Sequence, residues 1–71
     1  MQSPMVTITG KEVVMKLFPD QTDGDDWAVV LKEGDESVFL AHVKNYEACL
    51  ETMETIMVSF AALGYKLDSE F

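Results

Sequence analysis

The stretch NYEACLETMETIMVSFAALG, residues 45–64, carries the clearest structural signal in the sequence. Asn45 is a favourable residue at a helix N-terminus, and Gly64 suits the left-handed position that follows a helix. Between them the apolar residues share one continuous arc at 100° per residue, which is typical of an amphipathic helix: Tyr46, Cys49, Leu50, Met53, Ile56, Met57, Phe60, Ala61 and Leu63. The pattern predicts a helix over residues 46–63, about 27 Å long, with Tyr65 packing on Phe60 beyond its end.

Strand patterns precede this helix. Residues 12–18 are rich in β-branched and large apolar side chains and predict a strand that Pro19 closes, followed by a polar loop over residues 20–26. Residues 27–33 and 36–44 predict a hairpin, because Gly34 and Asp35 between them suit a type II′ turn. Residues 6–9 predict one more short strand. Gly10 after it is either part of a hairpin turn or a bulge within one longer strand.

The order of these segments predicts an α+β fold: a three- to four-stranded antiparallel β-meander followed by one long amphipathic helix packed on one sheet face. Residues 65–67 are a candidate for the last edge strand. We expect one small domain over residues 1–71, with residues 1–5 and 68–71 loose.

Length and charge limit the classes of function. A chain of 71 residues buries a small core, and oligomerisation is a common remedy at this size. Thirteen acidic residues against 5 Lys and Arg give a net charge of −8, which disfavours direct binding to nucleic acid. The negative charge favours binding to a basic partner or a cation, or it only keeps the protein soluble.

The single cysteine, Cys49, excludes an intramolecular disulfide and fits a reducing compartment. No apolar run approaches the length of a membrane span, and the first residues do not resemble a signal peptide. The expected location is therefore cytoplasmic, without membrane contact.

The hairpin register predicts a second apolar surface. A two-residue turn places Trp27, Val29 and Leu31 on one face, and we assign the helix to this face. The opposite face then keeps apolar side chains that one helix cannot cover, including Ala28 and Ala41. An exposed patch of this kind marks an interface, for which we expect a homodimer packed sheet against sheet. The alternative is that the N-terminal segment, or the tail with Phe71, folds over the patch. The predicted apolar partner surface comprises Val14, Phe18, Val30, Phe39 and Val43.

Acidic residues gather at one end of the predicted fold, where the loop over residues 20–26 meets the start of the helix. Helix-dipole stabilisation accounts for Glu47, and aspartates are ordinary turn residues, so the structural explanation competes with a functional one. The predicted acidic partner surface comprises Asp20, Asp23, Asp25, Asp26, Glu47, Glu51 and Glu54.

The sequence contains little evidence of a catalytic site. His42 could approach Cys49 as a nucleophilic pair, but Cys49 falls on the buried arc of the helix, where a free cysteine acts as a small hydrophobic residue. The aspartate loop does not match a calcium-binding loop, because Pro19 and Val30 occupy the first and twelfth ligand positions. We expect no enzyme activity, no catalytic residue, no cofactor and no metal.

The strand order, with an acidic glycine-containing loop before the second strand, resembles the partial RNase-H-like domain of HicB-type antitoxins over roughly residues 13–60. The chain lacks that family's Pro-Asp-Leu-Pro-Gly-like segment and its Thr-x-Glu-Glu-Ala helix start, so no residue roles are carried over. Small acidic α+β proteins also occur among phage and mobile-element inhibitors that mimic nucleic-acid charge.

The leading functional hypothesis is a non-enzymatic protein-interaction module that forms a homodimer and binds a basic or nucleic-acid-binding protein. The alternatives are a charge-mimicking inhibitor, a HicB-like antitoxin-type domain and, from another class, a small metal-dependent enzyme using His42 and the aspartate loop.

Overall fold

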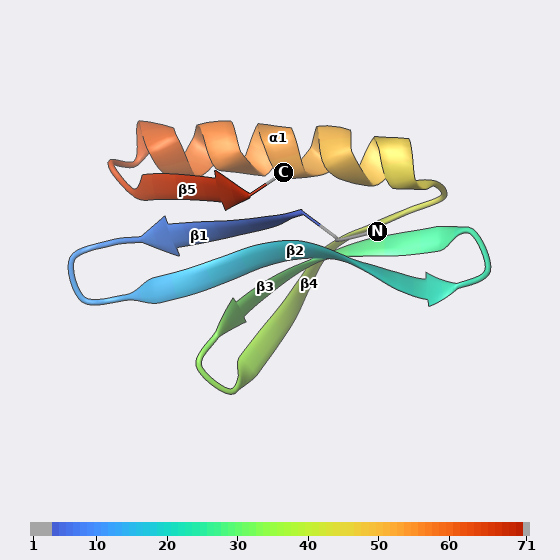
Figure 1. Ribbon diagram of the computed structural model, residues 1–71, viewed down its shortest axis with the longest axis horizontal. Coiled ribbons are helices and arrows are strands. Elements are labelled where there is room, and N and C mark those ends of the chain that lie inside the picture. The colour runs from blue at the N-terminus through green and yellow to red at the C-terminus, as the bar shows by residue number, and fades with distance from the viewer. Residues whose placement is uncertain (1–3, 71) are drawn as a thin grey trace.

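The computed structural model describes residues 4–70, which form a five-stranded antiparallel sheet with one helix packed on it (Figure 1). The strands pair in the order β4-β3-β2-β1-β5, which confirms the expected α+β class with more strands than predicted. In chain order the elements are β1 (Met5–Thr9), β2 (Val14–Asp23), β3 (Asp26–Glu33), β4 (Glu36–Val43), α1 (Tyr46–Ala62) and β5 (Lys66–Glu70).

Both ends of α1 are capped as its sequence predicts. The Asn45 side chain accepts a hydrogen bond from the Ala48 backbone N–H at 2.7 Å. At the other end Gly64 has a φ of 96°, its N–H donates to Ala61, and the Tyr65 N–H donates to Phe60. The Phe60 and Tyr65 rings meet edge to face with centroids 5.2 Å apart. These contacts stop the helix where the chain must turn into β5.

Glycine also sets the two tight hairpins. Glu33 pairs with Glu36 across the Gly34–Asp35 turn, and Asp23 pairs with Asp26 across Gly24–Asp25. Gly34 and Gly24 have φ values of 60° and 54°, whereas within residues 4–70 no residue other than glycine has a positive φ, so Asp35 and Asp25 fit the second position of a type II′ turn. The predicted loop over residues 20–26 is therefore wrong in extent, because most of it continues β2 and β3.

The prediction that Pro19 closes its strand is wrong, since β2 continues to Asp23. Strand β1 pairs with β2 only as far as Leu17, so beyond that point β2 has a hydrogen-bonded neighbour on one side. Proline is tolerated in such edge-like positions because its missing N–H need not serve a second strand.

The chain ends are more ordered than predicted. Residues 10–13 connect β1 and β2 as a hairpin, with the Gly10 N–H donating to the Val13 carbonyl at 2.8 Å, so residues 6–9 belong to a separate strand. Strand β5 pairs with β1 from Lys66 to Glu70, and Met5 begins β1. Residues 68–70 are thus part of the sheet, whereas residues 1–3 and 71 of the predicted loose ends lie outside the described residues.

The core lies between α1 and the sheet face of Trp27, Val29 and Leu31, which confirms the predicted side for the helix. The largest fully buried side chains are Ile8, Leu17, Met53, Val6, Val29 and Cys49. Strands β4 and β5 lie at opposite edges and, given the antiparallel order, run in the same direction. Helix α1 must therefore carry the chain back across the sheet, which accounts for its length.

A β-bulge in β4 changes which side chains face the helix. Val29 pairs with Ala41 but Val30 pairs with Phe39, so Leu40 is an extra residue without a partner on β3. The extra residue reverses the alternation, and Ala41 and Val43 pack against the core. The prediction that Val43 lies on the open face is therefore wrong, and so is that of Ala41.

Candidate functional site

The open face of the sheet, the side away from α1, exposes less apolar surface than predicted. Val30 pairs with Phe18 on one side and Phe39 on the other, and it is only 3% exposed. Ala28 is also buried, and Phe18 is half-buried. Of the predicted apolar surface, Val14 and Phe39 are the residues that solvent reaches most. The small residues of β3 are covered by their larger neighbours on β2 and β4.

The exposed apolar residues concentrate instead on the edge strand β4. Val38, Phe39 and Leu40 are 54%, 63% and 41% exposed, and we call them the β4 triad. Phe39 pairs with Val30 ahead of the bulge and lies on the open face, and the hairpin end of β3 and β4 twists away from α1 (Figure 1), where Val38 is exposed. Three consecutive exposed apolar side chains on a sheet edge are a typical interaction surface.

A row of polar side chains crosses the open face beside the aromatic residues. Lys16 and Lys32 are directly opposite each other on β2 and β3, and both are exposed. Thr7 pairs with Lys16 from β1, and Ser37 pairs with Lys32 from β4. The sequence analysis missed this row as a site. The sequence contains the information needed to find it, because Lys16 is two residues from Val14 and Lys32 is two residues from Val30. Alternate residues of a strand share a face, so each lysine lies on the face of its valine.

The predicted acidic end is partly assembled. The β2–β3 turn, with Asp23, Asp25 and Asp26, lies at the same end of the molecule as the start of α1, where Glu47 occupies the first turn (Figure 1). Asp20 stands apart on the open face, opposite Ala28. Glu51 and Glu54 lie about 6 and 10 Å further along the helix axis. All seven acids are exposed, so they form an open surface without an enclosed cavity.

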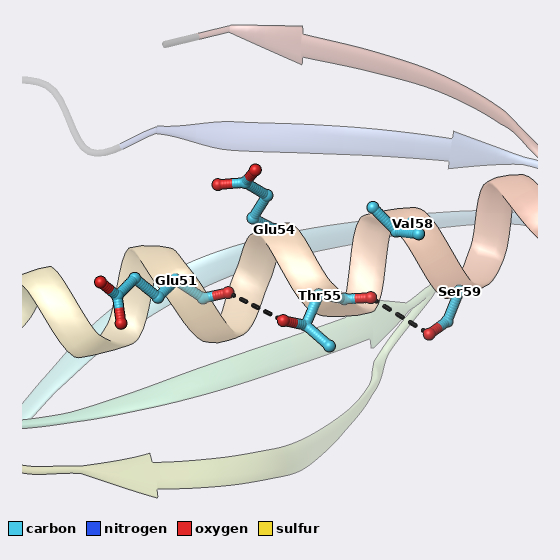
Figure 2. Close-up of a pocket in the computed structure, with 5 residues that line it drawn as sticks. All are labelled: Glu51, Glu54, Thr55, Val58 and Ser59. Atoms are coloured by element: carbon cyan, nitrogen blue, oxygen red, sulfur yellow. Dashed lines mark hydrogen bonds between the residues drawn. The ribbon is translucent and has the colours of Figure 1, made fainter.

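The outer flank of α1 beside these glutamates offers few free hydroxyl donors. The Thr55 hydroxyl donates to the Glu51 carbonyl at 3.2 Å, and the Ser59 hydroxyl donates to the Thr55 carbonyl at 3.1 Å (Figure 2). Thr52 makes the same bond to Ala48. These hydroxyl hydrogens are used within the helix. The shallow hollow lined by Glu51, Glu54, Thr55, Val58 and Ser59 therefore presents mainly carboxylates and one valine.

Cys49 and His42 lie on opposite sides of the sheet. Cys49 is fully buried under α1, and its thiol donates to the Ala28 carbonyl at 3.7 Å. His42 pairs with Ala28, whose side chain points away from the helix, and is exposed. Desolvation by burial raises the pKa of the Cys49 thiol, which keeps it protonated and unreactive. The two residues do not form a nucleophilic pair.

A metal centre and a membrane-spanning segment are two further classes of functional feature. Within residues 4–70, no three His, Cys, Asp or Glu side chains are grouped so that they could hold a metal ion. In that same part of the chain, α1 is neither long nor apolar enough to cross a membrane.

Comparison with known proteins returns no relative. No family model, no curated protein and no solved structure matches this chain. The resemblance to HicB-type antitoxins gains no support from these comparisons.

Proposed function

We propose that this chain is a small protein-interaction module that forms a homodimer through β4. The observation that carries the proposal is the β4 triad, in which Val38, Phe39 and Leu40 are exposed together on one sheet edge. A second copy that covers the triad removes this apolar surface from water in both chains.

The position of Lys16 and Lys32 favours the β4 margin over the whole open face as the contact. Packing two open faces squarely together would bring Lys16 and Lys32 of both copies into the interface, and neither lysine is paired with an acid in the sheet. Burying charges that lack partners is costly. The bulge at Leu40 also interrupts the hydrogen-bonding edge, so the contact is made by side chains and not by one continuous sheet.

The charges around β4 are complementary to those of a second copy in the antiparallel orientation. Asp35 and Glu36 precede the triad, whereas His42 and Lys44 follow it. When two β4 strands lie antiparallel about Phe39, the acidic start of each strand lies near Lys44 of the other. The same orientation places the two acidic ends of the protein at opposite extremes of the dimer, which reduces repulsion between the chains.

The expected affinity is modest. Covering the exposed part of each triad side chain is worth about 1 kcal/mol, or about 6 kcal/mol for both copies. Association itself costs a similar amount. The two terms nearly cancel, so the dimer should be weak and should form and separate readily.

Sedimentation velocity over micromolar to millimolar concentrations tests this proposal. Phe39→Ser is expected to weaken self-association at least about ten-fold, a cost of about 1.4 kcal/mol. Val58→Ser is the matched control, because Val58 on α1 is 65% exposed and Phe39 is 63% exposed. A monomer at every concentration would refute the dimer, and equal effects of the two substitutions would refute its placement on β4.

A second candidate function is an inhibitor that occupies a nucleic-acid-binding groove by mimicking phosphate charge. The observation that favours it is the meeting of the β2–β3 turn acids with Glu47 at one end of the molecule, continued along α1 by Glu51 and Glu54. A line of exposed carboxylates can take the place of successive phosphates on a basic protein.

Displacement of labelled DNA from a panel of basic DNA-binding proteins tests the charge-mimic function. The chain should displace DNA from its target at low salt and lose this ability as salt is raised. Converting Asp23, Asp25, Asp26, Glu47 and Glu51 to amides should abolish displacement. The control converts five exposed acids elsewhere, namely Glu12, Glu33, Asp35, Glu36 and Asp68, and makes the same change in net charge. Equal loss in both variants would mean that net charge, and not the acidic end, is responsible.

A further inference from the structure

The lysines of this acidic chain are distributed unevenly over its surface. Lys16, Lys32 and Lys66 all stand on the open face, Lys66 through its pairing with Thr9. The outer side of α1 carries Glu47, Glu51 and Glu54 instead. Asp20 and Asp68 also stand on the open face, so Lys16 and Lys32 are distinguished by being directly opposed and not by the charge of the face as a whole.

Lys16 and Lys32 form the centre of this positive surface. Directly opposed residues on one face of an antiparallel pair have Cβ atoms about 5 Å apart, and like charges in such positions destabilise the pair. The neighbours of the lysines on the open face are neutral: Thr7, Ser37, Val14, Phe18, Val30 and Gly34. Glu33 and Glu36 pair with each other on the opposite face, Asp35 lies in the turn between them, and Asp68 lies beyond Thr7 on the open face. The repulsion between the lysines is therefore not offset by a neighbouring carboxylate on their face.

The acids of the β2–β3 turn are too distant to repel an anion from this place, whereas Asp20 on the same face lies four residues, about 13 Å, from Lys16. Lys16 lies seven residues before Asp23 along the extended strand β2, roughly 23 Å away. Salt at physiological concentration screens charges over about 8 Å.

A hollow of about 260 Å³ opens beside the two lysines, lined by Val14, Lys16, Lys32 and Gly34. Gly34 has no side chain to fill it, and Val14, which is 54% exposed, gives it one apolar wall. Thr7 and Ser37 extend the row of possible hydrogen-bond donors on either side of the lysines.

We infer that this hollow binds an oxyanion, a phosphate or carboxylate group, between the ammonium groups of Lys16 and Lys32. The anion replaces the repulsion between the two lysines with two charge-assisted hydrogen bonds. Val14 contacts the adjoining apolar part of an organic anion. This site does not depend on the β4 dimer, because neither lysine belongs to the triad.

Titration of the labelled protein with sodium phosphate at constant ionic strength, followed by amide NMR shifts, tests the site. Saturating shifts at Lys16, Lys32 and Gly34 are expected, together with a higher melting temperature in phosphate than in chloride. Lys16→Gln and Lys32→Gln should each weaken binding at least ten-fold, whereas Lys44→Gln, with the same change in charge, should leave it unaltered. Because either glutamine relieves the repulsion, both variants should melt no lower than the parent, which separates lost binding from lost folding.

A second titration with hexanoate distinguishes the two chemical sources. Saturation with phosphate alone assigns the site to phosphate groups, and saturation with hexanoate assigns it to carboxylates that carry an apolar chain. Shifts that fail to saturate with either anion, or that persist in Lys16→Gln, would overturn the inference.

Discussion

Replacing Met53 with glutamate is expected to abolish cooperative folding. Met53 is fully buried at the centre of α1, between the helix and the sheet. A carboxylate at this position must either lose its hydration or force the helix away from the sheet, and both outcomes are costly. We expect a loss of about 5 kcal/mol, which is comparable to the whole stability of a small domain.

Urea denaturation followed by circular dichroism measures this effect. Val58→Glu is the matched control, because it adds the same charge to the same helix at a site that is 65% exposed. The control should differ from the parent by no more than about 0.5 kcal/mol. If Met53→Glu unfolded in the same cooperative transition as the control, the packing of α1 described above would be incorrect.

Replacing Leu17 with alanine is expected to lower the free energy of unfolding by about 3 kcal/mol. Leu17 is fully buried and pairs with Val6 on β1 and Leu31 on β3, so its removal leaves a cavity at the middle of the sheet. In a domain of this size the melting temperature should fall by roughly 12–24 °C.

Leu63→Ala provides the comparison for this second substitution. The chemical change is identical, but Leu63 is 74% exposed at the end of the helix. Thermal melting should separate the two variants clearly. A fall of only a few degrees for Leu17→Ala would show that β2 is not at the centre of the core.

The sequence predicts those parts of the fold that depend on local chemistry. The caps of α1 depend on Asn45 and Gly64, and the β3–β4 turn depends on Gly34, so nearby residues suffice to place them. The extent of β2 could not be predicted in the same way. Whether Pro19 ends a strand depends on where β1 stops pairing, and that is set by residues distant in the chain.

The candidate surfaces likewise include parts that local sequence predicts and parts that depend on residues distant in the chain. Alternation along β3 correctly assigns Trp27 and Val29 to the helix side. A single bulge at Leu40 then reverses which side chains of β4 face the helix beyond that point. No local sequence motif predicts this bulge. Apolar residue counts also overstated the open face, because the exposure of Val30 depends on its neighbours Phe18 and Phe39 and not on its own character.

The position of β1 between β2 and β5 has a consequence for how the chain is made. Met5 pairs with Glu70, so the pairing of β1 on this side must await a segment that is synthesised after the other strands and the helix. Until residues 66–70 leave the ribosome, β1 is an unprotected sheet edge, open to pairing with a neighbouring nascent chain. The Schellman turn at Gly64 directs the chain toward β1 as soon as α1 docks, and it therefore shortens the time in which that edge is exposed.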